Sequence, residues 1–161
     1  MGRVTQFFSH LTARVSRDEA ELARSLLQPG TWPLFAAMPV ADQRHGLDVA
    51  LRLRARGFTD PDLLAAALLH DAAKGHRMRV WHRVVGVLLE AFAPRLLARV
   101  ASDDPDSSGY PFHLYLHHPE LSARAVVAAG GSERIAAFII GDVTEDDAPM
   151  AAVLHATDEA S

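Results

Sequence analysis

The sequence predicts an all-α fold, and three observations carry that prediction. Apolar residues recur three and four positions apart in one segment after another, which is the period of one helix face. Capping residues and Gly or Pro separate these segments. No segment shows the apolar–polar alternation of a half-buried strand. The chain has 161 residues, of which 49% are apolar, and this favours a single domain, residues 1–161, around one core.

The N-terminal third is expected to form short helices. The apolar residues of the first predicted helix lie at helical spacing: Val4, Phe7, Phe8, Leu11 and Val15. Ser16 and Glu19 form a capping-box pair that opens a second helix through Leu27, and Pro29-Gly30 ends it. A short helical piece is expected over residues 32–38.

Two longer helices should follow. Asp42 is predicted to cap a helix that Gly57 closes. Asp60-Pro61 opens the next helix, since proline suits the first helical position. Residues 63–71 of that helix are apolar nearly all round, so the helix should be central and buried, and Gly75 should end it.

The C-terminal half reads as further helices joined by polar loops. The helices are expected at residues 81–92, 112–129, 132–139 and 149–158. Pro94 should break or restart the first of them, and residues 102–111 should form a polar loop that includes Gly109-Tyr110-Pro111. Ser132 is the predicted cap of the third helix, and the acidic residues 145–147 should lead into the last.

Composition excludes several function classes. The formal net charge of −4 argues against a nucleic-acid partner, which usually requires a basic face. No apolar run approaches the roughly 20 residues needed to span a bilayer, and no secretory signal is recognisable, so we expect a cytoplasmic protein without a membrane partner. The chain has no cysteine but nine histidines. Because histidine is the commonest metal ligand among side chains, the placement of these histidines is informative.

His70-Asp71 ends the most apolar predicted helix. The dipeptide alone means little, because Asp71 at a helix end can reach water and His70 can be a hydrogen-bonded core residue. A carboxylate buried there would need a cation or a metal as partner. His45 lies in the preceding helix and Asp158 in the last one. Two imidazoles and two carboxylates, with no thiolate, suit Mn, Fe, Mg or Zn.

The chain resembles the HD-domain superfamily of metal-dependent phosphohydrolases over about residues 42–159. The resemblance rests on Arg44-His45, on Ala66-Ala67-Leu68-Leu69-His70-Asp71-Ala72-Ala73-Lys74-Gly75, on His118-Pro119-Glu120-Leu121-Ser122-Ala123, and on Ala156-Thr157-Asp158-Glu159. The order His, His-Asp, Asp matches that family's metal set. Residues 66–75 are similar to its "ALLHDIGK" segment and residues 118–123 to its "HPExGA" segment.

This resemblance implies an HD-like helical bundle over residues 42–159, with residues 1–41 as an N-terminal helical extension. It implies a metal-activated water that hydrolyses a nucleotide phosphate ester or anhydride. The implied metal ligands are His45, His70, Asp71 and Asp158, with His118 as an additional one. Asp71 would also act as general base, and Lys74 would offset negative charge. The basic residues near the predicted site are candidates for substrate binding: Arg44, Lys74, Arg77 and Arg79.

The chain departs from the family pattern in one place. Two-metal members carry His-His or His-Thr where this sequence has Gly141-Asp142, so we expect one tightly bound divalent metal. Gly141 is also expected to adopt a left-handed conformation at a helix end. The Gly109-Tyr110-Pro111 tripeptide lacks the acidic, His-rich lead-in of the cyclic-di-GMP phosphodiesterase branch. The alternative function is an inactive HD-fold module for nucleotide binding or signalling, and the sequence does not indicate an oligomeric state.

Overall fold

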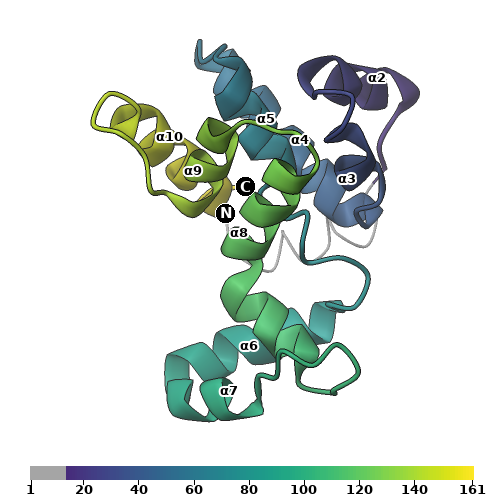
Figure 1. Ribbon diagram of the computed structural model, residues 1–161, viewed down its shortest axis with the longest axis vertical. Coiled ribbons are helices and arrows are strands. Elements are labelled where there is room, and N and C mark those ends of the chain that lie inside the picture. Colours follow the sequence, from purple (N-terminus) through teal and green to yellow (C-terminus); the bar gives the residue numbers. More distant parts are fainter. Residues whose placement is uncertain (1–13) are drawn as a thin grey trace.

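The computed structural model describes residues 14–161, with the backbone alone at position 80, and within this range it is helical without strands. This confirms the predicted all-α class. The helices, labelled as in Figure 1, are α2 (Arg17–Leu26), α3 (Trp32–Ala36), α4 (Val40–Ala55), α5 (Pro61–Leu69), α6 (Val80–Phe92), α7 (Pro94–Val100), α8 (Tyr110–Ala128), α9 (Glu133–Ile140) and α10 (Ala148–Glu159). Of the first predicted helix, Val4, Phe7, Phe8 and Leu11 lie outside the described residues.

Side-chain caps begin several helices as the sequence predicts. The Ser16 hydroxyl accepts the Glu19 backbone N–H, and the Glu19 carboxylate accepts the Ser16 N–H. Asp60 caps α5, and Ser132 caps α9. Pro94 starts α7 as its first residue, where its missing N–H costs nothing.

Three helix boundaries differ from the prediction. Asp42 does not cap α4, which begins at Val40; its carboxylate is buried and accepts two hydrogen bonds from Arg83. Helix α5 ends at Leu69, and residues 70–77 form turns rather than a continuation to Gly75. Helix α8 begins at Tyr110, so Tyr110 and Pro111 belong to its first turn and not to the preceding loop. Pro111 fits that first turn for the same reason as Pro94.

Most helices pack into one bundle around α5. Every residue of α5 from Leu63 to Leu69 is buried, as the apolar sequence predicts. Helices α4, α9 and α10 contact α5, and α9 also packs along α8 (Figure 1). The largest fully buried side chains of this core include Phe35, Leu47, Leu53 and Phe138. The core therefore positions the four helices on which, or next to which, the candidate ligands lie: α4, α5, α8 and α10.

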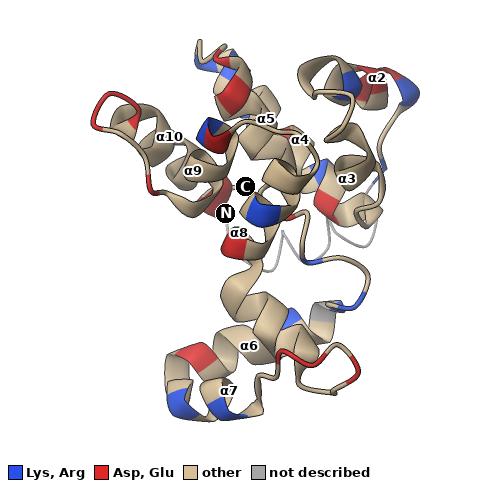
Figure 2. Cartoon of the chain, viewed as in Figure 1, with Lys and Arg blue, Asp and Glu red and all other residues tan. Residues whose placement is uncertain are grey.

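Helices α6 and α7 form a small lobe at one end of the molecule, attached to the N-terminal half of α8 (Figure 1). Met78, Leu97 and Leu114 are buried there, outside the main core. The lobe leaves large apolar side chains in contact with water, above all Phe92, which is 84% exposed. Figure 2 shows acidic residues on the loop that joins α7 to α8. Among the described residues, no helix is long and apolar enough to cross a membrane.

Candidate metal centre

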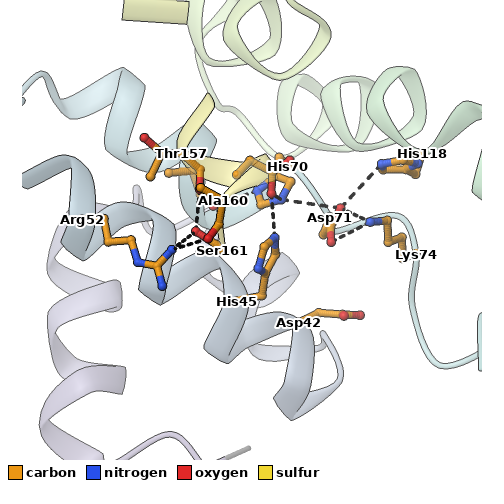
Figure 3. A network of polar contacts seen from close by, with 12 residues as sticks. Asp42, His45, Arg52, His70, Asp71, Lys74, His118, Thr157, Ala160 and Ser161 are labelled. Carbon is orange, nitrogen blue, oxygen red and sulfur yellow. Dashed lines mark hydrogen bonds and ion pairs between the residues drawn. The ribbon is translucent and has the colours of Figure 1, made fainter. Parts of the chain in front are cut away.

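Five candidate ligands come from four separate parts of the chain. His45 lies on α4, His118 on α8 and Asp158 on α10. His70 is the C-terminal cap of α5, and Asp71 begins the turns that follow. Figure 3 shows the His45, His70, Asp71 and His118 side chains directed toward one region.

Three of these residues form a compact donor group. His45 Nε2 lies 2.7 Å from Asp158 Oδ1, and His70 Nε2 lies 3.3 Å from the same oxygen. One ligand atom from each of His45, His70 and Asp158 lies within 4.8 Å of the other two. Two imidazoles and a carboxylate at this separation have the chemistry and spacing to share one cation.

Asp71 and Lys74 lie beside this group. Asp71 is 2% exposed. Its Oδ1 lies 3.7 Å from His70 Nε2, 3.6 Å from His118 Nε2 and 2.6 Å from Lys74 Nζ. Lys74 donates a hydrogen bond to Asp71 Oδ2 at 2.8 Å. The buried carboxylate therefore lies between His70 and His118 with a cationic partner, as Figure 3 shows.

Backbone carbonyls orient His70 and His118 in the same way. His70 Nδ1 lies 2.9 Å from the Ala67 carbonyl, and His118 Nδ1 lies 3.0 Å from the Tyr115 carbonyl. Pro119 explains the second contact, because proline has no N–H to donate to the carbonyl four residues earlier. When Nδ1 donates to a carbonyl, Nε2 presents its lone pair to the centre, which is how ligating histidines are commonly held.

Ser122 supports the turn that carries Asp71 and Lys74. Its hydroxyl is buried on α8 and accepts the Ala73 backbone N–H at 3.0 Å. The turn would otherwise have a partly buried donor without a partner, which is costly. No local sequence signal marks Ser122 for this role, because its partner lies 49 positions away.

Burial and neighbouring charges together shift the pKa values of the residues in the site. Burial lowers the pKa of His70, but attraction to the nearby Asp71 and Asp158 carboxylates outweighs it and raises that pKa to about 9. Burial raises the pKa of Asp71, but Lys74 and His70 hold it far below its usual range. Burial and the Lys74 charge lower the pKa of His118 to about 4. Near neutral pH the Asp71 carboxylate is therefore ionised and His118 is neutral, both ready to act as ligands, whereas His70 must lose a proton to bind a cation.

Two buried polar atoms at the centre lack a hydrogen-bond partner. His70 Nε2 and Asp71 Oδ1 make no hydrogen bond to any described residue, although ion-pair contacts surround both. Leaving buried polar atoms unsatisfied is costly unless another group binds them. The residues present therefore fit a divalent cation held by His45, His70 and Asp158, with Asp71 adjacent.

Among the described residues, the three predicted substrate-binding arginines make no ion pair with a candidate ligand. Arg44 forms ion pairs with Glu19 and Asp48 and so contributes to helix packing. Arg77 donates to the Pro105 carbonyl, and Arg79 precedes the first residue of α6. Of the predicted basic residues, only Lys74 contacts a candidate ligand directly.

His155 is a neighbour of the centre that the metal set from the sequence omits. It lines a cavity of about 90 Å³ together with His70, His118 and Asp158. Gly141 has a φ of 86°, as expected of a left-handed helix end, and a Cβ added there would lie 3.0 Å from His155 Nε2. The signal in the sequence is the spacing of His155 three residues before Asp158, which places both on one side of α10.

Comparisons with protein-family models, with curated proteins and with solved structures find no match to this chain.

Proposed function

We propose that this chain is a metal-dependent phosphohydrolase of the HD-domain type that acts on a nucleotide phosphate ester or anhydride. The observation that carries the proposal is the convergence of His45, His70 and Asp158 from three helices onto one point, with their ligand atoms within 4.8 Å of one another. The unsatisfied Nε2 of His70 and Oδ1 of Asp71 support it. The order of these residues along the chain is that of the family it resembles.

His45, His70, Asp71 and Asp158 would hold the cation, with Mn, Fe, Mg and Zn as the candidates. A divalent cation bound there would supply Lewis-acid chemistry, lowering the pKa of water and polarising a phosphoryl oxygen. Asp71 is ionised and adjacent, so its carboxylate is the group that accepts a proton from the attacking water. Lys74 is the nearest cation and offsets the negative charge that develops on the phosphoryl group.

Metal binding tests the first part of the proposal. We expect the purified chain to bind about one Mn, Fe or Zn ion tightly, because the compact group provides one complete set of ligands. His70→Ala should abolish tight binding, whereas His76→Ala should retain it, since His76 is exposed and outside the compact donor group. The measurement is calorimetric titration together with elemental analysis. A wild-type chain that takes up none of these ions contradicts the proposal, and two tight ions per chain would assign a ligand role to His118 or His155.

Hydrolysis tests the second part. We expect the metal-loaded chain to release phosphate or a nucleoside monophosphate from a panel of mononucleotides, dinucleoside polyphosphates and cyclic dinucleotides. A chelator should stop the reaction and added metal should restore it. The control is the His70→Ala variant, prepared identically. If the metal-loaded wild type leaves every compound intact, the non-catalytic nucleotide-binding module becomes the better description.

A further inference from the structure

The lobe formed by α6 and α7 meets the turns after α5 at a cavity of about 450 Å³, which we call the loop cavity. Its walls come from the turns after α5, the first turn of α6, the loop before α8 and the first turn of α8. The residues that line it include His76, Arg77, Arg79, Trp81, Pro105 and Tyr110. This volume is within the range of pockets that hold small molecules, about 300–1,000 Å³.

A second cavity, lined in part by Lys74, adjoins the loop cavity. This second cavity has a volume of about 230 Å³ and shares His76, Arg77, Pro105 and Tyr110 with the loop cavity. Lys74 Nζ lies 2.6 Å from Asp71 Oδ1. A molecule bound in the loop cavity can therefore extend past Arg77 as far as the cavity that Lys74 lines, although no candidate metal ligand lines either cavity.

The charge of the loop cavity suits an anion. Neither Arg77 nor Arg79 forms an ion pair with a carboxylate of residues 14–161, whereas the partly buried Arg44, Arg83 and Arg134 all do. Arg77 is held in place by the Pro105 carbonyl and by the Tyr110 ring, whose centroid lies 5.7 Å from its guanidinium carbon. A guanidinium held in this way is well suited to bind a phosphate group.

Trp81 provides a flat apolar surface in the same cavity. Trp81 is 54% exposed, and the centroid of its ring lies 3.6 Å from that of His82. One face is therefore covered by His82, and the exposed remainder is available to a planar ligand. Nucleobases stack on such aromatic side chains.

We propose that the loop cavity binds a nucleoside phosphate, with its base against Trp81 and its phosphate between Arg79, Arg77 and Lys74. Because Lys74 lines the neighbouring cavity and contacts Asp71, this inference rests on the proposed function and names Arg79 and Trp81 as residues that select the substrate. Nucleoside and phosphate should each bind more weakly than the joined molecule, since each provides only half of these contacts.

Binding to the metal-free protein tests this inference separately from catalysis. Adenosine monophosphate is titrated by equilibrium dialysis in the presence of chelator, with adenosine and inorganic phosphate as the separate halves. We expect the monophosphate to bind most tightly, and Trp81→Ala or Arg79→Ala to weaken it roughly 10-fold each. Trp81→Phe keeps an aromatic ring and should restore most of the binding. Arg95→Ala, an exposed arginine on α7 outside the loop cavity, should have no effect.

Two results would overturn the inference: no binding of the monophosphate, or equal binding in the wild type, Trp81→Ala and Arg79→Ala. Thermal melts by circular dichroism establish that the variants are folded. The His70→Ala variant separates the two proposals, because it should lose metal binding and retain nucleotide binding. Wild-type protein that binds the nucleotide through Trp81 but takes up no metal would refute the proposed function and leave this inference standing.

Discussion

In the proposed hydrolysis, Lys74 would have two roles, according to whether a phosphate is bound. In the structure its ammonium group contacts the buried Asp71 and keeps the pKa of that carboxylate low. A carboxylate with a low pKa is a poor proton acceptor. When Lys74 turns toward a phosphoryl oxygen, Asp71 loses part of this stabilisation and becomes a better base. One lysine can therefore couple substrate binding to the proton transfer that hydrolysis needs.

Replacing Lys74 tests this coupling. We expect Lys74→Ala to lower kcat by roughly 10- to 1000-fold, the range for loss of one electrostatic contact to a transition state. The measurement is steady-state hydrolysis at saturating metal and substrate, with metal content determined in parallel. Arg95→Ala serves as the matched loss of a positive charge. A Lys74→Ala variant with normal metal content and normal kcat would exclude Lys74 from the reaction.

At this scale the sequence predicts which candidate ligands lie together, but not where the side chains beside them point. The order His45, His70-Asp71, Asp158 identifies residues that the structure brings together, and His118 lies near Asp71 as expected. Arg44 was a substrate candidate because it neighbours His45, but adjacent helix residues point about 100° apart. Its side chain therefore reaches Glu19 on α2, a partner that only tertiary packing reveals.

At the scale of single helices, Gly141 shows how one residue ends α9 beside the candidate metal centre. Its φ of 86° favours glycine, because a Cβ in the left-handed region costs about 1–2 kcal/mol. Gly57 ends α4 with a similar φ of 90°, but its Cβ would have no neighbour within 4 Å. The two glycines therefore differ mainly in the contact with His155.

We expect Gly57→Ala and Gly141→Ala each to lower the free energy of unfolding by about 1 kcal/mol, with a further small loss at Gly141 because His155 must move. Urea denaturation of both variants measures the difference. Adding His155→Ala to Gly141→Ala should remove the extra loss. An equal loss of unfolding free energy in Gly57→Ala, Gly141→Ala and the double variant would show that His155 moves aside without cost. A negligible loss in both single glycine variants would contradict the proposed strain of a Cβ at positive φ.

The sequence predicts a helix end correctly where a side chain caps the backbone of its own helix. It does not do so where the side chain binds a residue far away along the chain. Ser16, Asp60 and Ser132 act within three residues of their own position, so the local sequence contains the full signal. Asp42 has the chemistry of a cap, but its partner Arg83 lies 41 positions away. The early end of α5 places His70 and Asp71 on a turn, and Ser122 on α8 supports that turn. Local patterns do not contain these tertiary contacts.

For the whole molecule, the pair Asp42–Arg83 links the α6–α7 lobe to the main bundle. Asp42 on α4 is 1% exposed, and both of its carboxylate oxygens accept a hydrogen bond from Arg83 on α6, at 2.7 and 2.8 Å. The lobe otherwise joins the bundle through α8 and the turns after α5. The relative position of the loop cavity and the metal centre therefore depends on this buried ion pair.

We expect Asp42→Ala to lower the free energy of unfolding by about 3 kcal/mol, because it leaves the partly buried Arg83 charge without its partner. The double variant Asp42→Ala with Arg83→Met should recover much of this loss, since an apolar replacement of a buried pair is often close to neutral.

Trp32 in the bundle and Trp81 in the lobe allow each part to be followed by fluorescence in Trp81→Phe and Trp32→Phe backgrounds. The two urea transitions should coincide in the otherwise unmodified protein. In Asp42→Ala the Trp81 transition should come first, because the lobe loses its link to the bundle. Coincident transitions in Asp42→Ala would show that α8 and the turns after α5 couple the two parts without this ion pair.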